Sequence, residues 1–284
     1  MFESTNLVSP GFGLELTHYD KWNLLMQKKE LLNRSHEMGG RPAEAEALKI
    51  LEELRLQLIE RCNYQNEKNW VASVSCLNRI SLSKILFYED IIRRIVNIPG
   101  AILELGVQWG ALTSLLYNLT AIHEPYNFRR KIAGFDTFSG FPASSLSEAE
   151  LNQGWLPSDL AGASDAKQIA LRCLDAHQVF SAMSHMARHE FVEGDVMETL
   201  PNWFSSNPSE TVALCIFDMD LGIPTKEALK HVLRRSQKGT ILVFDEYSHP
   251  RFPDEGAVVR EMLDVMSLQP IKSPLLPYTS FIVL

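Results

Sequence analysis

The sequence predicts an α/β protein with a doubly wound parallel sheet that carries helices on both faces. From residue 101 onward, short apolar runs alternate with helical patterns, the order expected when helices cross between parallel strands. The first apolar run, 101–105, leads into a helical pattern through Gly106 and Gly110. Ligands bind beyond the carboxyl ends of such strands. Four predicted strands have an acid at or next to their carboxyl end, so we expect a functional site at that edge of the sheet. These acids are Glu104, Asp136, Asp218 and Asp245.

The predicted elements follow an N-terminal arm at 1–18. Helical spacing of apolar residues predicts helices at 19–35, 43–66 and 81–96, with a break at Gly39-Gly40-Arg41-Pro42. β-like runs predict strands at 101–105, 131–135, 190–192, 212–217 and 240–244. The helices among these strands are predicted at 111–120, 166–183, 224–235 and 256–266. A faint alternation predicts a closing β-hairpin from 269–273 and 278–283.

Two regions stand apart from this alternation. Residues 1–78 hold the arm and the first helices, and we interpret them as a helical extension that acts as a lid or an oligomer contact. Residues 79–284 form the sheet domain, which a long connection at 137–190 interrupts. Connections of this length tend to form lids or binding loops, so substrate choice is expected there and in the extension.

Composition narrows the class of protein. The chain has 284 residues, of which 45% are hydrophobic and 22% charged, and its net charge is −8. An acidic chain argues against nucleic acid as the main partner, because phosphate binding needs a basic face. The sequence has neither a signal-peptide pattern nor an apolar run long enough to span a bilayer. The cysteines form no C-x-x-C pair and no metal-ligand spacing, which predicts free thiols in a cytoplasmic protein: Cys62, Cys76, Cys173 and Cys215.

The turn after residue 105 departs from the dinucleotide-binding pattern. A G-x-G-x-x-G motif that starts at Gly106 needs glycine at the positions of Gln108 and Ala111. The observed pattern is E-x-G-x-x-x-G, from Glu104 to Gly110, and glycine there lets a ligand approach the backbone closely. At this turn the sequence resembles class I S-adenosylmethionine (SAM) methyltransferases, whose cofactor has no pyrophosphate. The alternative is an ordinary strand–turn–helix.

Residues around this turn are candidates for holding SAM. Asp136 ends the second strand, where an acid accepts hydrogen bonds from ribose hydroxyls; the alternative is a turn or helix cap. Glu104 would hold the glycine turn or face the charged end of SAM. Asp195 follows the third strand and could accept the adenine amino hydrogen, although Gly-Asp is also a common turn. The predicted cofactor site is completed by Gly106, Gly110, Thr137 and Val196.

A second group of acids follows the fourth and fifth strands. Asp218, Asp245 and Glu246 would offer the hard oxygen ligands that Mg²⁺ prefers. Such an ion would lower the pKa of an acceptor hydroxyl and orient it toward the methyl group, so Asp218 is also a catalytic candidate. The alternative is that nearby lysines or helix caps relieve the like charges. His249 is a candidate base or substrate contact, with an ordinary loop role as its alternative.

Two tryptophans and two arginines are weaker candidates for ligand contact. Trp109 and Trp155 could stack on adenine or on a sugar face, although the backbone of Trp109 in the glycine turn matters more than its ring. Arg129 and Arg130 are interpreted as a solvated charge pair, with contact to a phosphate or an acidic sugar as the alternative.

Residues from about 79 to 284 resemble the macrocin O-methyltransferase-like family, which methylates sugar hydroxyls in natural products and surface glycans. The matching segments are 102–110 (ILELGVQWG), 134–142 (GFDTFSGFP), 194–201 (GDVMETLP), 217–221 (FDMDL) and 238–247 (KGTILVFDEY). The resemblance implies a Rossmann-like methyltransferase sheet, SAM as cofactor, and Mg²⁺ bound by Asp218, Asp245 and Glu246. Two departures are Glu246, where the family commonly has Asp, and Gly222, where it often has an aromatic residue.

The resemblance and the acid pattern together predict a SAM-dependent O-methyltransferase that acts, with Mg²⁺, on a hydroxyl of a sugar or glycosylated natural product. The expected partners are a small hydroxyl acceptor and further copies of the same chain. A phenolic, catechol or other secondary-metabolite hydroxyl is a competing acceptor. A nucleotide-dependent oxidoreductase and a non-catalytic subunit that binds SAM are competing functions. The absent G-x-G-x-x-G spacing counts against the oxidoreductase, and the intact acids count against the non-catalytic subunit.

Overall fold

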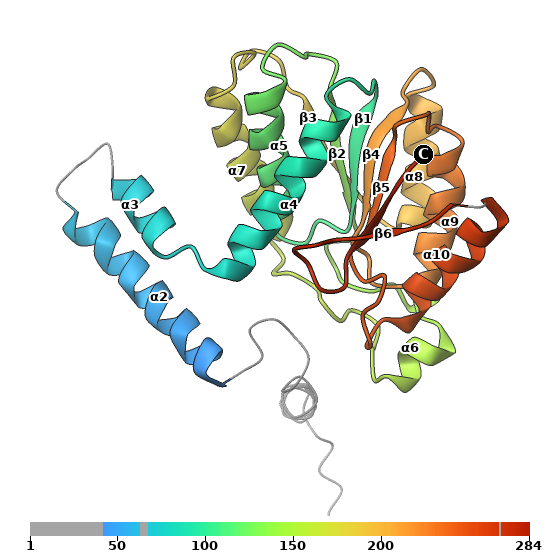
Figure 1. The fold of residues 1–284 in the computed structure, drawn as a ribbon, viewed down its shortest axis with the longest axis horizontal. Helices are drawn as coiled ribbons and strands as arrows, with labels where there is room; N and C mark the ends of the chain where they lie inside the picture. The colour runs from blue at the N-terminus through green and yellow to red at the C-terminus, as the bar shows by residue number, and fades with distance from the viewer. Residues whose placement is uncertain (1–41, 63–67, 267) are drawn as a thin grey trace, which may run out of the picture. The chain divides into compact units, whose positions relative to one another are not determined.

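The computed structural model describes residues 42–62, 68–266 and 268–284 (Figure 1). The predicted arm and the predicted helix at 19–35 therefore lie outside the described residues. The chain divides into two compact units, Met1–Ile80 and Ser81–Leu284. Within the described stretches, no helix is both long enough and apolar enough to cross a membrane.

The described part of the first unit contains helices. α2 (Pro42–Arg61) packs against α3 (Lys68–Ser75). α2 confirms the helix predicted at 43–66, and Pro42 stands at its first position, where its missing N–H leaves no hydrogen bond unmade. The sequence analysis missed α3, whose eight residues are too few to show helical periodicity.

The second unit is built around a seven-stranded sheet in the order β3-β2-β1-β4-β5-β7-β6. β1 to β5 are parallel, whereas β7 pairs antiparallel with both β5 and β6. This arrangement confirms the doubly wound sheet and the closing hairpin. The strand order reverses between β1 and β4, which is where ligands bind in open α/β sheets. The strands are β1 (Ala101–Leu105), β2 (Ile132–Asp136), β3 (His189–Glu193), β4 (Val212–Phe217), β5 (Ile241–Phe244), β6 (Ile271–Lys272) and β7 (Ser280–Val283).

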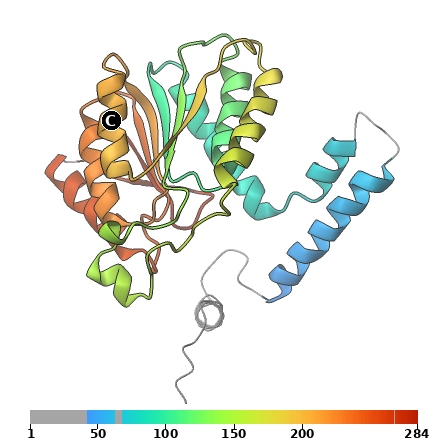
Figure 2. The ribbon, with the colours of Figure 1, turned by 180° about the vertical axis from the view of Figure 1, so that it is seen from behind.

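Helices cover both faces of the sheet, as Figure 1 and Figure 2 show. Successive residues of β1 point to opposite faces, so that Ile102 and Leu103 belong to different core clusters. Both faces of the parallel strands are therefore core, which explains their continuous apolar runs. One face carries α4 (Arg79–Ile95), α5 (Ala111–His123) and α7 (Ala166–Val179), and the other carries α8 (Val196–Ser206), α9 (Gly222–Leu233) and α10 (Pro253–Met266).

α8 is the longest element that the sequence analysis missed. Asp195 caps it by accepting a hydrogen bond from the Met197 amide at 2.9 Å. Pro201 lies inside the helix and removes one backbone donor, which weakens the helical signal. Leu200 and Trp203 on its inner face are buried in the core. Tertiary burial therefore stabilises a helix whose own sequence disfavours it.

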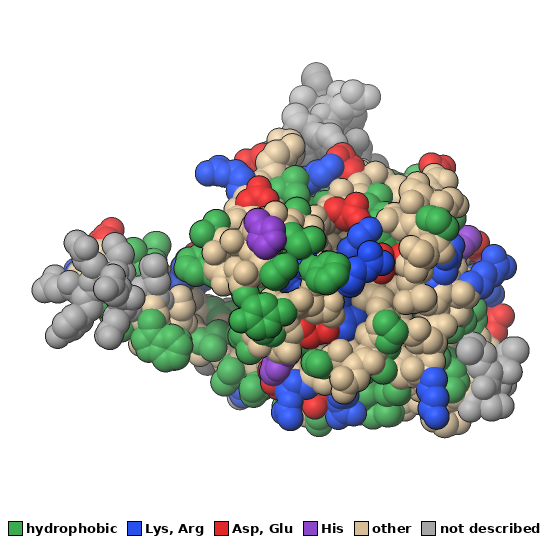
Figure 3. All heavy atoms as spheres, turned by 90° about the horizontal axis from the view of Figure 1, so that it is seen from above, with side chains coloured by type: hydrophobic (Ala, Val, Ile, Leu, Met, Phe, Trp, Pro, Cys, Tyr) green, Lys and Arg blue, Asp and Glu red, His purple; other side chains and the backbone are tan. Residues whose placement is uncertain are grey.

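The edge of the sheet where the parallel strands begin lies opposite the predicted acidic edge. Figure 3 views the end of the molecule where α5 and α7 finish, and hydrophobic side chains lie there among basic and acidic ones. Exposed large hydrophobic side chains near these helix ends include Ile122, Tyr126, Phe128, Val179 and Phe180.

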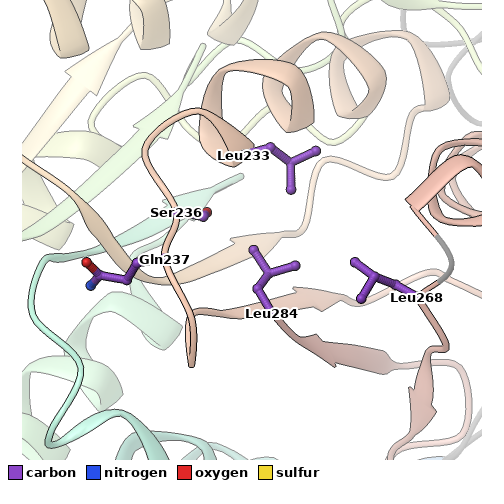
Figure 4. A pocket seen from close by; sticks show the side chains of 5 residues that line it. All are labelled: Leu233, Ser236, Gln237, Leu268 and Leu284. Atoms are coloured by element: carbon purple, nitrogen blue, oxygen red, sulfur yellow. The ribbon is translucent and has the colours of Figure 1, made fainter.

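A pocket of about 300 Å³ lies at the same end of the sheet (Figure 4). One of its lining residues, Leu284, donates a backbone hydrogen bond of 2.9 Å to Thr240, which precedes β5. The predicted acids follow the opposite end of β5, so this pocket is separate from them. Its lining consists of Leu233, Ser236, Gln237, Leu268 and Leu284.

A buried ion pair joins Arg130, in the loop before β2, to Glu124 at the end of α5. Arg130, 2% exposed, donates to both carboxylate oxygens of Glu124 at 2.8 Å. Its guanidinium also donates to the carbonyl oxygens of Ile95, Ile98 and Gly100. The interpretation of Arg130 as a solvated charge is therefore wrong, because it satisfies the carbonyls at the end of α4 and at the entry to β1.

We expect Arg130→Met to lower the free energy of unfolding by ~3–5 kcal/mol, because it leaves the Glu124 carboxylate buried without its partner. Urea unfolding of the full chain measures this loss. Arg129→Met, at the exposed neighbouring position, is the matched control and should change the free energy by ~0.5 kcal/mol or less. Equal losses in the two variants would contradict the buried-pair argument.

Candidate cofactor and metal site

The glycine turn after β1 is held against the end of β4. Gly106 has a φ of 99°, a left-handed value that side chains disfavour. A Cβ added at Gly106 would overlap the carbonyl oxygen of Asp218. The Asp218 amide in turn donates to the Leu105 carbonyl at 2.8 Å. Only glycine fits at position 106, because the Asp218 backbone occupies the space of a side chain. This contact joins the predicted cofactor turn to the predicted metal loop.

Gly110 also faces protein atoms. It is the N-cap residue of α5 with a φ of 72°, and an added Cβ would lie 2.6 Å from the Cβ of Ala170. Ala170 belongs to α7, so the helix of the 137–190 insertion packs directly over the glycine turn. The sequence analysis attributed glycine here to the close approach of a ligand, whereas the structure shows close protein neighbours at both positions.

Asp136 organises the same turn with both of its carboxylate oxygens. Oδ2 accepts hydrogen bonds from the amides of Val107 and Gln108, each at 2.7 Å. Oδ1 accepts one hydrogen bond from the Phe138 amide at 2.6 Å. Asp136 thus acts as a turn cap, and a carboxylate oxygen with one protein donor has room for a second donor such as a ribose hydroxyl. Ribose binding by Asp136 stays a prediction.

Two other predicted cofactor residues are held by local hydrogen bonds. Glu104 is buried in β1 and accepts a hydrogen bond from the Thr113 hydroxyl of α5 at 2.6 Å. Burial, with repulsion from Asp218 and Asp136, raises the pKa of Glu104 well above its usual range. The Thr137 hydroxyl donates to the Gly140 carbonyl at 2.7 Å and shapes the first turn of the insertion. Glu104 therefore ties β1 to the first turn of α5, and its predicted roles at the glycine turn and toward SAM stay predictions.

The segment after β3 is a helix start. Asp195 uses Oδ1 to cap α8, and Val196 is the first residue of that helix, packed into the core. Gly194 donates its amide to the Asp136 carbonyl at 2.9 Å, which places this segment beside the end of β2. The turn role of Asp195 is present in the structure, and its contact with adenine stays a prediction.

Three carboxylates meet beyond the ends of β4 and β5. Asp218, Asp220 and Glu246 each offer an oxygen ligand atom, and these atoms lie within 4.8 Å of one another. Asp220 has a φ of 65°, a strained value that persists in proteins mainly at functional sites. The sequence analysis predicted Asp245, in the segment after β5, as a ligand. The structure instead brings in Asp220, in the segment after β4. We call Asp218, Asp220 and Glu246 the acidic trio.

Asp245 is held by two side chains outside the acidic trio. Its Oδ1 accepts a hydrogen bond from the Thr279 hydroxyl at 2.7 Å, just before β7. Its Oδ2 lies 3.8 Å from Nζ of Lys84 on α4. No local sequence signal points to Thr279 or Lys84, because both lie far from Asp245 along the chain. The alternative that a lysine relieves the like charges therefore holds for Asp245.

The acidic trio is poorly solvated, and its charges repel one another. Burial raises the pKa of Asp218 to about 7; repulsion from Asp245 adds to this shift, and Lys84 opposes it. Burial followed by repulsion from Asp218 raises the pKa of Asp220 well above its usual range. Burial followed by repulsion from Asp245 does the same for Glu246. The site therefore favours whatever neutralises it, protons or a cation.

The acidic trio fits a divalent cation. Its donors are hard carboxylate oxygens, the ligands that Mg²⁺ prefers. Oε2 of Glu246 is buried and makes no hydrogen bond within the part of the chain that the structure describes. An oxygen in that state is available to a cation, so the residues present suit Mg²⁺.

His249 lies in the loop after Glu246. Its Nδ1 accepts a hydrogen bond from the Arg251 amide at 3.2 Å. Its ring meets Tyr278 edge-on at 4.4 Å between ring centroids and lies 5.3 Å from the ring of Phe252. These contacts support the loop role of His249, while its part in proton transfer stays a prediction.

The insertion docks onto the loops that carry the acids. Its short helix α6 (Glu148–Asn152) begins with a capping box formed by Ser147 and Glu150. Glu150 also accepts a hydrogen bond from the Gly222 amide at 3.0 Å, at the start of α9. The Ser147 hydroxyl donates to Asp254 at the start of α10. α6 was not predicted, and these contacts fix the insertion beside the acidic trio.

Aromatic packing fixes the same insertion. Trp155 is 3% exposed, stacks on Phe252 with 4.5 Å between ring centroids, and donates from its indole nitrogen to the Arg251 carbonyl at 3.0 Å. The prediction that Trp155 could stack on adenine or a sugar is therefore wrong, because neighbouring side chains bury its ring. Trp109 is 44% exposed, and the same prediction stays open for it.

We expect Gly106→Ala to abolish binding of S-adenosylhomocysteine and to lower the free energy of unfolding by ~3 kcal/mol or more, because the new methyl group overlaps the Asp218 backbone. Calorimetric titration and urea unfolding measure the two effects. Gly154→Ala is the matched control: its φ of 88° is also positive, but no atom lies within 4 Å of an added Cβ. It should cost ~1–2 kcal/mol and leave binding intact.

The pKa of Asp218 predicts how the metal-free protein responds to pH. Its ordinary value is 3.8 and its folded value about 7, so folding takes up a proton between these limits. The free energy of unfolding therefore falls as pH rises from about 4 to about 7. Urea unfolding of the wild type at about pH 5.5 and at about pH 7.5 should show this loss of stability. Asp218→Asn should reduce the loss, whereas the control Asp165→Asn, at an exposed position without a side-chain cap hydrogen bond, should not.

Comparisons with known proteins identify the family of this chain and support its fold. A family model described as macrocin-O-methyltransferase (TylF) matches residues 63–266. The crystal structure of CalS11, calicheamicin methyltransferase, is 27% identical, covers 97% of this chain and 99% of its own, and has a TM-score of 0.78. An apo structure of CalS11 is described as TDP-rhamnose 3'-O-methyltransferase, an enzyme in calicheamicin biosynthesis. It is 28% identical, covers 89% of this chain and 98% of its own, and has a TM-score of 0.72.

A more distant structure supports the fold alone. The O-methyltransferase NovP is 20% identical, covers 70% of this chain and 79% of its own, and has a TM-score of 0.53. No curated protein sequence matches this chain. The family model spans well over half of the chain, from the segment before α3 to the end of α10, and it confirms the resemblance seen in the sequence. This chain therefore belongs to the macrocin O-methyltransferase (TylF) family, a family of SAM-dependent O-methyltransferases of natural-product biosynthesis.

Proposed function

We propose that this chain transfers the methyl group of SAM to a hydroxyl of a sugar or of a glycosylated natural product, with the assistance of Mg²⁺. One observation carries the proposal: the backbone contact between Gly106 and Asp218 sets the cofactor turn directly beside the acidic trio. Both lie where the strand order reverses, which is the ligand-binding position of open α/β sheets. A donor and an activated acceptor can therefore meet at one edge of the sheet.

The chain's own residues would bind and align the two reactants. The turn from Gly106 to Gly110 and the Asp136 carboxylate would hold the nucleoside part of SAM, with Asp195 and Val196 beside the adenine. The carbon–sulfur bond of the sulfonium breaks as the carbon–oxygen bond forms, and the acceptor hydroxyl loses one proton. Holding the reactants in line supplies much of the rate enhancement in such a displacement.

The acidic trio would hold Mg²⁺, which when bound lowers the pKa of a coordinated hydroxyl. Lys84 would stay on Asp245 and reduce the repulsion around the trio. We propose Asp218 as the catalytic member of the trio, because its backbone lies against the cofactor turn. His249, three residues after Glu246, is proposed to take the hydroxyl proton or to contact the acceptor.

The sugar acceptor is supported by the similarity to CalS11, which is 27% identical over 97% of this chain. CalS11 is described as acting on TDP-rhamnose, and we propose a nucleotide-linked sugar as the first acceptor to test. A phenolic or catechol hydroxyl is the competing acceptor, because a carboxylate-bound Mg²⁺ accommodates hydroxyls of either kind. A subunit that binds SAM without turnover is the competing function.

The proposal extends to the organisation of the chain. We propose that residues 1–78 form a lid or an oligomer contact, that residues 79–284 bind SAM, and that the protein works as a homo-oligomer. A reducing compartment such as the cytoplasm is supported by the free thiols among the described residues, Cys62, Cys76, Cys173 and Cys215.

We expect S-adenosylhomocysteine to bind the full chain with micromolar affinity in calorimetric titration, with or without Mg²⁺. Asp136→Ala should weaken binding ~10-fold or more, because the carboxylate holds the turn amides and would accept from the ribose. Asp175→Asn, on the exposed surface of α7, should bind normally. Absence of binding to the wild type under every condition would overturn the cofactor site.

We expect methyl transfer to TDP-rhamnose in the presence of Mg²⁺, and loss of this activity when a chelator is added. Asp218→Asn should lower kcat ~100-fold or more while S-adenosylhomocysteine still binds, because the change removes a charged ligand and leaves the Asp218 backbone in place. Transfer that persists in the chelator would remove Mg²⁺ from the proposal. Transfer to a catechol in preference to TDP-rhamnose would favour the non-sugar acceptor.

A further inference from the structure

Glu255 is a buried carboxyl group that the proposed reaction does not use. It lies in the first turn of α10 and is 0% exposed. Neither of its carboxyl oxygens has a hydrogen-bond partner in the described part of the chain. By contrast, the buried Glu150 accepts hydrogen bonds from two backbone amides, and the buried Glu124 pairs with Arg130. A buried polar group without a partner lowers the stability of the fold, so the presence of Glu255 here points to a ligand.

Two close contacts place Glu255 between the loops that carry the acidic trio. A Cβ added at Gly256 would overlap the carbonyl oxygen of Tyr247, the residue after Glu246. On the other side, a Cβ added at Gly222 would lie 2.7 Å from the Cβ of Asp254. The first turn of α10 is thus wedged between the segment after Asp220 and the segment after Glu246.

The electrostatic surroundings of Glu255 agree with this position. Burial raises the pKa of Glu255 well above its usual range, and repulsion from Asp220, Asp245 and Asp218 adds to the shift. The nearby backbone amide of Glu246 lowers the pKa in part, although it lies outside normal hydrogen-bond geometry. Glu246 also interacts with Glu255, and its Oε2 is a second buried carboxylate oxygen without a hydrogen bond among the described residues. Two glutamates with buried, unpartnered oxygens therefore lie close enough to repel each other.

We infer that Glu255 is an outer-sphere carboxylate of the cation site: it accepts hydrogen bonds from water held by the ion and adds a negative charge that retains the ion. The inference rests on the proposed Mg²⁺ site. Glu255 is not one of the residues whose ligand atoms lie within 4.8 Å of one another, so it is one layer further out than the acidic trio. Mg²⁺ gives up its water reluctantly and keeps several water molecules when bound by few carboxylates. Outer carboxylates that orient such a site contribute ~10–100-fold in metal affinity.

The test is Mn²⁺ binding to the metal-free full chain, measured from the electron paramagnetic resonance signal of free Mn²⁺. Glu255→Gln should raise the Kd for Mn²⁺ ~10–100-fold. Its thermal midpoint without metal should not fall, because the substitution keeps the shape of the side chain and relieves repulsion from Asp220. Asp254→Asn is the matched control: it removes one charge from the same helical turn, but its carboxylate accepts from Ser147. It should change the Kd by ~3-fold or less.

The outcomes separate this inference from the proposed function. An unchanged Kd in Glu255→Gln, or a change no larger than in Asp254→Asn, would overturn the role of Glu255 and leave the Mg²⁺ site intact. A lower thermal midpoint with an unchanged Kd would assign Glu255 a structural role instead. A wild type that binds no Mn²⁺ yet transfers methyl groups would overturn both the inference and the metal assistance, but not the methyl transfer. A wild type that binds Mn²⁺ through Glu255 without binding S-adenosylhomocysteine would overturn the proposed function alone.

Discussion

The close approach of the turn after β1 to the end of β4 is the constraint on which the candidate site depends. Gly106 leaves no room for a side chain because the Asp218 carbonyl occupies that space, and the Asp218 amide bonds back to Leu105. These two strands are neighbours only because the strand order reverses between them. One backbone contact therefore sets the distance between the cofactor turn, which Asp136 braces, and the first residue of the acidic trio.

The second constraint is electrostatic. Several carboxyl groups crowd one poorly solvated edge, and burial is the first cause of the raised pKa in Asp218, Asp220, Glu246 and Glu255. Thr279 bonds to Asp245, and Lys84 pairs with Asp245 and offsets only part of the repulsion within the trio, which protons or a cation would neutralise. The crowded carboxylates lower the stability of the fold unless something neutralises them, and this need supports the proposed Mg²⁺ site.

The insertion after β2 packs against one side of the sheet edge that carries the acids. Glu150 bonds to the start of α9, Ser147 bonds to the start of α10, and Trp155 is buried against Phe252. Ala170 of the same insertion packs on Gly110 at the other end of the cofactor turn. The insertion therefore contacts both the glycine turn and the segments next to the acidic trio, the two parts of the site proposed to hold SAM and Mg²⁺.

The sequence alone was sufficient for the sheet, the glycine turn and the position of the acids. Each of these follows from a local rule: apolar period, turn chemistry, or the convergence of parallel strand ends at one edge. The helix at Val196–Ser206 escaped the same reasoning because Pro201 interrupts its local signal and burial of Leu200 and Trp203 stabilises it.

Only the tertiary structure decided which charges are paired and which are not. Arg130 looks like a surface charge until Glu124 and three carbonyls surround it. Asp245 accepts a hydrogen bond from Thr279, which is 34 residues away in the chain. Asp220 belongs to the acidic trio and has a left-handed backbone conformation. The isolation of Glu255 depends on how α10 packs against two loops. Hydrogen bonding and burial of a polar side chain depend on residues remote in the chain, so local sequence rules do not specify them.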